Sequence, residues 1–328
     1  METLVICILI SLFTIVCTIA KPNFFWNHRK ARRLRGFIGD TGTSIFYFVL
    51  AIVIFVIGVM QYLEPPKEDN FMKAYNLHQE GKYEEALTYY KKVVEEDPKN
   101  DAAYNNIAWV LNDLDKHEEA LVYSDKSIEL DSDDAEPYAN KGNALLGLGK
   151  YEEAMKNYEL AIKYDSKCSY AYYGKGIVYY ENGEYEKSIE DFNEYVKLKP
   201  KDVDGYYYLG EAYYNLSEFE KAVTNYDKVI EIDKNEEVAY MYKADALYYL
   251  EKYDEALINY DKSIQLNPNF ADAFYGKSRV LSELNKAEES LAVLTKAIEL
   301  NKEYKEYAKT DEAFENLKEN SKFIALTK

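Results

Sequence analysis

The sequence repeats itself at intervals of 34 residues. The stretch "GKYEEALTYYKKVVEEDP" at 81–98 returns as "DKHEEALVYSDKSIELDS" at 115–132 and as "GKYEEAMKNYELAIKYDS" at 149–166. Seven ungapped blocks of this length run from Lys67 to Tyr304. A fixed period of this kind indicates stacked copies of one small unit, because each copy can bury its apolar face only against the next copy.

Two positions in every block hold only small residues. Position 8 reads Ala74, Ala108, Gly142, Gly176, Gly210, Ala244 and Ser278, and position 20 reads Ala86, Ala120, Ala154, Ser188, Ala222, Ala256 and Ser290. Apolar residues at helical spacing lie on both sides of a turn near positions 14 to 16, so each block predicts helix, turn, helix. Small residues at these positions let the two antiparallel helices approach closely.

These columns resemble the tetratricopeptide repeat (TPR), whose pattern also has an aromatic residue at position 4. That position reads Tyr104, Tyr138, Tyr172, Tyr206, Tyr240 and Phe274 from the second block onward. The resemblance implies an all-α fold, a TPR α-solenoid of seven helix-turn-helix repeats. The expected repeats are 67–100, 101–134, 135–168, 169–202, 203–236, 237–270 and 271–304, and residues 305–328 are expected to form a C-terminal capping helix and tail.

Two columns depart from the family pattern. Position 7, where the pattern has leucine, is a lysine in most repeats, among them Lys141, Lys175, Lys243 and Lys277. Position 27, where the pattern has a small residue, is Tyr195 in the fourth repeat. We expect looser local packing at these residues without loss of the fold.

Two uncharged apolar segments precede the repeats, at residues 3–20 and 41–63. Each has close to the roughly 20 residues that a helix needs to cross a bilayer. A signal peptide is disfavoured for the first segment, because no positive charge precedes it. We therefore expect two transmembrane helices in a membrane anchor of residues 1–66, with a linker that begins at Pro65 and Pro66.

Residues 21–40 are expected to form a basic loop between these helices. Its basic side chains are Lys21, Arg29, Lys30, Arg32, Arg33 and Arg35, against the single acid Asp40. Short loops rich in Lys and Arg stay in the cytoplasm, which predicts a multi-pass protein of the cell membrane with an extracytoplasmic array. The candidates for a topology signal and for contact with anionic lipid of the bilayer are the five basic residues Arg29, Lys30, Arg32, Arg33 and Arg35.

Charge and motifs exclude several function classes. The totals of 40 basic and 58 acidic residues, less six and three in residues 1–66, leave 34 and 55 in residues 67–328, a net charge of −21. So acidic a body repels phosphate backbones, and no nucleic-acid partner is expected. The three cysteines and three histidines are too dispersed for a metal site. Catalytic and phosphate-binding motifs are lacking, so we expect no enzyme, no cofactor and no metal.

The family resemblance implies that positions 2, 5, 6, 9, 12 and 13 of each repeat line a concave groove. The candidate binding residues at these positions are Tyr170, Tyr173, Tyr180, Tyr207, Tyr208, Glu211, Tyr214, Tyr242, Asp245, Tyr248, Tyr249 and Tyr275, with Tyr75 and Trp109 nearer the start. Packing of the helices does not require tyrosine there, whereas exposed tyrosines favour binding of other proteins. The alternative is a general bias of composition toward tyrosine.

A tyrosine-rich, acidic groove favours protein or peptide partners with Lys or Arg in the bound segment. Capture of a C-terminal carboxylate, as in some members of the family, is not expected, because position 5 holds no lysine. The hypothesis is a membrane-anchored TPR scaffold or adaptor for protein assembly in the cell envelope, of unknown oligomeric state. Two alternatives stay open: an array in the cytosol that recruits soluble factors, or a structural subunit that acts through its transmembrane hairpin.

Overall fold

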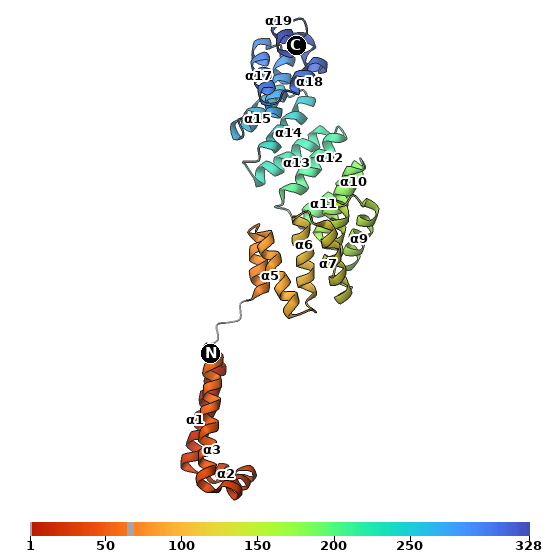
Figure 1. Ribbon diagram of the computed structural model, residues 1–328. Coiled ribbons are helices and arrows are strands. Elements are labelled where there is room, and N and C mark those ends of the chain that lie inside the picture. Colours follow the sequence, from red (N-terminus) through yellow and green to blue (C-terminus); the bar gives the residue numbers. More distant parts are fainter. Residues whose placement is uncertain (1, 64–68) are drawn as a thin grey trace. The chain divides into compact units, whose positions relative to one another are not determined.

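The computed structural model describes residues 2–63 and 69–328, and every regular element in these ranges is helical (Figure 1). The chain divides into two compact units, residues 1–73 and 74–328. The boundary expected at residue 66 and the linker prolines Pro65 and Pro66 lie outside the described residues.

The first unit is a helical hairpin. Helix α1 (Glu2–Ala20) packs along α3 (Arg29–Leu63), and the short α2 (Asn23–Trp26) lies between them in the chain. A Cβ atom added to Gly58 would lie only 2.5 Å from Cys7 Cβ, so the two helix backbones are in close contact at this point. Small residues allow this close approach of helices where both are surrounded by apolar material.

Three threonine hydroxyl groups in the hairpin are satisfied by the helix to which they belong, whereas the buried Ser11 hydroxyl has no hydrogen-bond partner among the described residues. Thr14 Oγ1 donates a hydrogen bond of 2.8 Å to the carbonyl of Ile10, and Thr18 Oγ1 donates one of 2.7 Å to the carbonyl of Thr14. Thr43 Oγ1 bonds in the same way to the carbonyl of Gly39, at 2.8 Å. These polar side chains therefore need no water, as burial in an apolar environment demands.

Of the expectations for the hairpin, that of two transmembrane helices is supported only for the second, and that of a basic loop at 21–40 needs correction. Within the described residues, Arg29–Met60 is the one stretch long and apolar enough to cross a membrane, and Leu4–Ala20 is a shorter apolar helix. The basic segment 21–40 is largely helical, because Arg, Lys, Ala and Leu after residue 28 are strong helix formers. The helix bends at Gly39, whose φ is 73°.

Seven helix pairs make up the array, and Figure 1 shows them stacked in chain order. They are α4 (Asn70–Gln79) with α5 (Tyr83–Glu96), α6 (Asp101–Asp113) with α7 (His117–Leu130), α8 (Glu136–Gly147) with α9 (Tyr151–Tyr164), α10 (Ser169–Glu181) with α11 (Tyr185–Leu198), α12 (Val203–Asn215) with α13 (Phe219–Ile232), α14 (Glu237–Tyr249) with α15 (Tyr253–Leu266), and α16 (Ala271–Glu283) with α17 (Ala287–Leu300). The expected helix-turn-helix repeats are confirmed.

The turn inside each repeat has one backbone conformation throughout. Position 15 is left-handed in all seven repeats, at Gly81, Asp115, Gly149, Gly183, Ser217, Glu251 and Asn285. In the first repeat the following amide, Lys82 N, bonds back to the carbonyl of Leu77 at 2.9 Å. Such a left-handed residue ends a helix and satisfies its last carbonyls, so the second helix starts at the same place in every copy.

Inside three repeats, an aromatic ring at position 24 lies against a glycine at position 8. Tyr158 faces Gly142, Phe192 faces Gly176 and Tyr226 faces Gly210, and all three rings are fully buried. A Cβ atom on Gly210 would lie 2.6 Å from Cε1 of Tyr226. The ring therefore fills the space that the missing side chain leaves, and it sets the separation of the two helices.

The expected loosening at the position 7 lysines was wrong. Three of them pair with an aspartate on the second helix of the preceding repeat, namely Lys141 with Asp125, Lys243 with Asp227, and Lys277 with Asp261. Lys175 instead pairs with Asp191 in its own repeat, with Nζ 3.2 Å from Oδ1. A charged link between stacked helices thus replaces the apolar contact that leucine would make.

Tyr195 does not loosen the packing either. Its side chain is buried, and the neighbouring repeat makes room for it with Gly205, where a Cβ atom would lie 2.6 Å from the Tyr195 ring. The equivalent residues of the flanking repeats are Ala171 and Ala239. A smaller residue in one repeat therefore compensates for a larger one in the repeat before it.

The C-terminal cap is three short helices and not a single one. They are α18 (Tyr304–Thr310), the 3-10 helix η1 (Glu312–Leu317) and α19 (Ser321–Thr327). The side chains of Asp311 and Asn320 accept hydrogen bonds from backbone amides two residues later, so each begins a new helix. Phe314, Leu317 and Phe323 are buried in one cluster with Leu291 and Leu294 of α17, which covers the end of the array.

Replacing Gly210 by valine is expected to lower the free energy of unfolding by about 2 kcal/mol, because the buried Tyr226 ring must move. Ile258→Ala is the control, since its side chain is 69% exposed, and a loss below about 0.5 kcal/mol is expected there. Urea unfolding followed by circular dichroism measures both. Equal stability of Gly210→Val and the parent chain would contradict the packing of ring against glycine.

Candidate protein-binding groove

The first helices of the repeats, α4 to α16 in steps of two, form a surface that we call the inner face. Two hollows open among its residues. One, of about 340 Å³, is lined by Trp109 and Asp113 of α6, Tyr170 and Tyr173 of α10, Asp204 of α12 and their neighbours. The other, of about 240 Å³, lies toward the C-terminal end.

The second hollow is lined by residues of α14 and α16 and by the start of the cap. Tyr242 and Asp245 come from α14, Tyr275 and Arg279 from α16, and Tyr304 from α18. Both hollows therefore combine aromatic rings with carboxylates. The predicted residues Tyr170, Tyr173, Tyr242, Asp245 and Tyr275 lie in one or other of them.

The predicted groove tyrosines differ sharply in exposure. Tyr170 and Tyr249 are 46% and 47% exposed. The others are half-buried, namely Tyr173, Tyr180, Tyr207, Tyr208, Tyr214, Tyr242, Tyr248 and Tyr275. The expectation that packing does not require these tyrosines therefore fails for most of them.

Half-burial follows from contacts between rings of successive first helices. Tyr173 of α10 lies against Tyr208 of α12 with ring centroids 5.8 Å apart, and Tyr207 of α12 lies against Tyr242 of α14 at 5.6 Å. Both pairs have the edge-to-face geometry that aromatic rings favour. The rings thus fill the interfaces among α10, α12 and α14 and present only their outer edges to a partner.

Tyr275 belongs to the cap more than to the inner face. Its ring stacks on Tyr304 at 4.3 Å, and its hydroxyl donates a 2.8 Å hydrogen bond to Asp311 Oδ2. Tyr304, the last residue of the seventh repeat, begins α18, and Asp311 lies after that repeat. The repeat pattern therefore placed Tyr275 on the correct helix, but its side chain packs against the C-terminal cap.

Position 9 on the inner face is matched to the ring at position 24 behind it. In the third repeat the Tyr158 hydroxyl donates to Asn143 Oδ1 at 2.9 Å, and in the sixth the Tyr260 hydroxyl donates to Asp245 Oδ1. In the fourth repeat both positions are apolar, Ile177 and Phe192. The fully buried phenols thus hold the inner-face side chains in place.

In the fifth repeat, positions 9 and 24 are also a carboxylate and a tyrosine, but no hydrogen bond joins them. Glu211 is one methylene longer than Asp245, and the buried Tyr226 hydroxyl has no hydrogen-bond partner among the described residues. Burial raises the pKa of Glu211 to about 7, and the nearby charge of Glu181 adds to this effect. Burial likewise raises the pKa of Asp245 to about 6. Both carboxyl groups sit where a cationic ligand would favour their ionised form.

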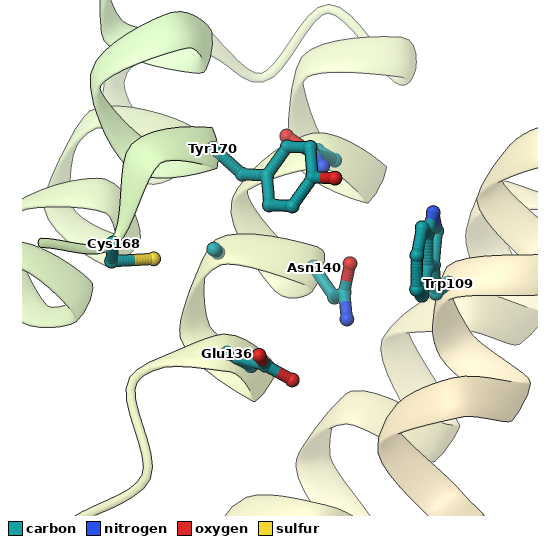
Figure 2. A pocket seen from close by; sticks show the side chains of 7 residues that line it. Trp109, Glu136, Asn140, Cys168 and Tyr170 are labelled. Atoms are coloured by element: carbon teal, nitrogen blue, oxygen red, sulfur yellow. The ribbon is translucent and has the colours of Figure 1, made fainter. Parts of the chain in front are cut away.

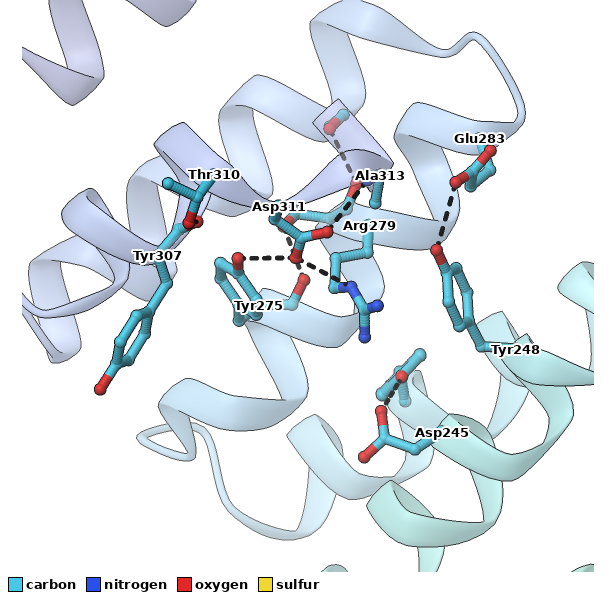
Figure 3. A network of polar contacts seen from close by, with 12 residues as sticks. Asp245, Tyr248, Tyr275, Arg279, Glu283, Tyr307, Thr310, Asp311 and Ala313 are labelled. Atoms are coloured by element: carbon cyan, nitrogen blue, oxygen red, sulfur yellow. Dashed lines mark hydrogen bonds and ion pairs between the residues drawn. The ribbon is translucent and has the colours of Figure 1, made fainter. Parts of the chain in front are cut away.

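Sequence reasoning missed Arg279, which organises the C-terminal hollow (Figure 3). Its guanidinium lies 4.4 Å from the ring centre of Tyr248, and its Nε lies 3.1 Å from Asp311 Oδ2. Tyr248 in turn donates to Glu283 Oε1 at 3.2 Å. The signal was present, because Arg279 is the basic residue of the position 9 column, but its partner Asp311 lies outside the repeat register.

A smaller pocket of about 50 Å³ adjoins the N-terminal hollow and shares Trp109 and Tyr170 with it. Figure 2 shows its side chains, with the Asn140 amide between Trp109 and Tyr170 and Glu136 beneath. Sequence reasoning noted Trp109 but missed Asn140 and Glu136, because neither stands out by composition. In the part of the chain that the structure describes, no three His, Cys, Asp or Glu side chains are grouped to hold a metal.

Replacing Glu211 by glutamine is expected to change the pH dependence of stability. Because the folded-state pKa of Glu211 is raised, its stabilising contribution is complete below its ordinary pKa and is lost as pH rises through about 7. The glutamine variant lacks this loss, so its unfolding free energy should exceed that of the parent at alkaline pH, by on the order of 2 kcal/mol after allowing for partial exposure.

Urea unfolding at several pH values between about 5 and 8.5 measures this difference. Glu220→Gln, an exposed residue of α13, is the control that changes charge by the same amount. Identical pH profiles for Glu211→Gln and Glu220→Gln would show that Glu211 titrates normally.

Comparison with known proteins supports this fold. Among solved structures, YrrB, described as a TPR protein with an unusual peptide-binding site, is 28% identical, with 55% of this chain and 92% of that chain covered and a TM-score of 0.51. Two structures that show the fold alone are both 20% identical: the C-terminal part of a TPR protein from Cytophaga hutchinsonii (75% and 99% covered, TM-score 0.56) and PilF from Pseudomonas aeruginosa (63% and 96%, TM-score 0.55).

No curated relative matches the chain. Models of the tetratricopeptide repeat match it in succession at residues 77–141, 140–203, 203–236, 238–270 and 271–304. They cover all seven helix pairs except the beginning of the first. From residue 77 to residue 304, the chain belongs to the tetratricopeptide repeat family.

Proposed function

We propose that this protein is a membrane-anchored TPR scaffold that binds peptide segments rich in Lys or Arg on its inner face. One observation carries the proposal: both inner-face hollows are lined by aromatic rings together with carboxylates. Aromatic faces and carboxylates both attract cationic side chains, and an aromatic surface also supplies the apolar contact area that gives affinity.

Three further observations support a basic partner. Residues 67–328 carry a net charge of −21, from 34 basic and 55 acidic residues, which steers cationic partners toward the array. The half-buried carboxyl groups of Glu211 and Asp245 have raised pKa values, so a cation beside them would relieve the cost of their ionisation. The similar protein YrrB is described as a TPR protein with an unusual peptide-binding site, and we propose a peptide partner for this chain as well.

For the first unit, we propose that α1 and α3 enter the membrane together as a hairpin. The two helices pack along each other, and their large apolar side chains are mostly exposed on the outside of the hairpin. Four basic side chains at the start of α3 are exposed, namely Arg29, Lys30, Arg32 and Arg33. Arg35 is held instead by Trp26, 5.4 Å from the ring centre, and by Asp40.

The positive end of such a hairpin stays in the cytoplasm, where anionic lipid head groups attract it. The array then lies on the outer side of the membrane, in a position to serve protein assembly in the cell envelope. An array in the cytosol and a hairpin that itself carries the function are the outcomes that would replace this proposal.

Alkaline phosphatase fused after Lys328 is expected to be active in intact cells, because the enzyme folds only outside the cytoplasm. Substituting Arg29, Lys30, Arg32 and Arg33 together by glutamine should sharply reduce this activity, since it removes the topology signal. A fluorescent protein that matures only in the cytosol is the control at the same fusion site. Fluorescence without phosphatase activity would place the array in the cytosol.

Binding is tested by removing the two most exposed tyrosine rings of the inner face, Tyr170→Ala with Tyr249→Ala; Tyr75, which is 39% exposed, is left in place. Pull-down from solubilised membranes is expected to lose most of the captured partner, because each exposed ring contributes contact area at little cost to folding. The control removes two exposed rings elsewhere, Tyr164 of α9 and Tyr307 of α18, which are 38% and 54% exposed. Raising salt from about 0.05 to about 0.5 M should also weaken capture of a basic partner.

Equal capture by the Tyr170/Tyr249 variant and the Tyr164/Tyr307 variant would count against the inner face. Melting temperatures of both variants show whether the array has stayed folded. The half-buried tyrosines are unsuitable for truncation to alanine, because rings such as Tyr207 and Tyr242 hold neighbouring first helices together.

A further inference from the structure

In the pocket of about 50 Å³ between α6, α8 and α10, the hydrogen bonds fix which end of each asparagine amide faces which neighbour. Glu136 Oε2 accepts a 2.9 Å bond from Asn105 Nδ2, and Asn105 Oδ1 accepts a 2.7 Å bond from Asn140 Nδ2. A carboxylate accepts only, so Asn105 must turn its NH₂ group toward Glu136 and its oxygen toward Asn140. Asn140 must then turn its NH₂ group toward Asn105, and its own oxygen faces the other way.

That oxygen is presented to the pocket. Figure 2 shows Asn140 Oδ1 on the side of Trp109 and Tyr170, away from Glu136. None of the described residues donates a hydrogen bond to it, although the Asn140 side chain is half-buried. The chain of bonds from Glu136 through Asn105 thus fixes an acceptor, not a donor, at the pocket wall. A ligand group in this place has to be a donor.

Two aromatic rings flank this acceptor. The Trp109 and Tyr170 ring centres are 6.2 Å apart, with the ring planes inclined by 51°. Trp109 is held from behind by His78, whose ring centre is 4.3 Å away and whose Nε2 lies 2.8 Å from Asp113 Oδ2. The tryptophan is therefore a rigid wall. Tyr170 is the more accessible wall, since 46% of its surface is exposed.

The local charge is negative. Glu136 lines the small pocket, and Asp113, Asp202 and Asp204 line the hollow that adjoins it. Asp113 is occupied by His78, and Asp202 caps α12 through the amide of Asp204. The Asp204 carboxylate has no ion pair among residues 2–63 and 69–328. Lys199 Nζ lies 5.4 Å from the Tyr170 ring centre, and the four carboxylates named above outnumber this cation.

We infer that this pocket receives an arginine side chain of the bound segment, with its guanidinium beside Trp109 and Tyr170 and its N–H groups directed at Asn140 Oδ1 and Glu136. The inference rests on the proposed function and assigns one position of the bound peptide. A guanidinium offers five donors and no acceptor, is planar enough to stack on a ring, and stays charged at all physiological pH values. The ammonium group of lysine is charged but not planar, and the ureido group of citrulline is planar but not charged.

The test uses the full chain in detergent with Trp26→Phe, because the sequence has two tryptophans and Trp109 then becomes the sole fluorophore of its kind. Three acetylated and amidated pentapeptides are titrated, with Arg, Lys or citrulline between glycines. The Arg peptide is expected to change Trp109 fluorescence saturably. The Lys peptide should bind about tenfold more weakly, and the citrulline peptide should give no saturable change.

Two variants test the pocket itself. Asn140→Leu removes the fixed acceptor, and Tyr170→Ala removes one exposed wall without disturbing a buried side chain. Both are expected to abolish the saturable response, while Tyr307→Ala, at an exposed ring of α18, leaves it unchanged. Circular dichroism shows whether Asn140→Leu still folds, and Tyr170→Ala decides the matter if it does not.

The arginine assignment is overturned if the Arg and citrulline peptides behave alike, or if Tyr170→Ala responds like the parent chain. The arginine assignment is wrong while the proposed peptide binding still holds if the membrane partner is captured through Tyr170 and Tyr249 but the Arg peptide gives no response. Loss of the proposed function has a different signature, because capture of the partner would then be the same in the Tyr170/Tyr249 variant and the Tyr164/Tyr307 variant.

Discussion

The contact between one buried ring and one glycine inside each of the third, fourth and fifth repeats is the constraint on which the middle of the array depends. Tyr158, Phe192 and Tyr226 lie so close to the position 8 glycines that no side chain would fit there. This contact sets the separation of the two helices in a repeat. Because these three consecutive repeats use it with the same spacing, they stack in register and their first helices share one surface.

The same rings connect the core to the inner face. Position 9 follows position 8 on the first helix, so a phenol at position 24 reaches the inner-face side chain as well as the core. Tyr158 thereby orients Asn143, and Tyr260 orients Asp245. Inner-face polar groups are held by buried partners instead of being free to rotate, which reduces the entropy that binding would otherwise cost.

Much of the fold was predictable because it is periodic. The 34-residue spacing gave the helix pairs, and the small columns indicated how closely the helices pack. The half-burial of Tyr207 and Tyr242 was not predictable, since it depends on which rings face each other across two repeats. The same holds for Tyr195, whose size is absorbed by Gly205 in the next repeat. Comparing one repeat position at a time does not show that a smaller residue in one repeat makes room for a larger one in the repeat before it.

The candidate site was predictable only in its general character. Aromatic and acidic residues at inner-face positions indicated a surface for basic peptides. The bonds that orient Asn140 through Asn105 and Glu136 involve three residues from two repeats, and no single column reveals them. Arg279 was missed because its partner Asp311 belongs to the cap, which leaves the repeat register. In the hairpin, segment 21–40 was expected to be a loop because of its charge, although Arg, Lys, Ala and Leu have strong helix propensity.

The most direct test of the inner face as the binding surface is site-specific photocrosslinking in intact membranes. A photoreactive amino acid placed at Tyr170 is expected to form a covalent adduct with a discrete partner protein, and the same amino acid at Tyr164 on the second helix of the third repeat is expected to form none. Adducts of equal yield at both positions, or an adduct only at Tyr164, would contradict the assignment of the inner face as the place where partners bind.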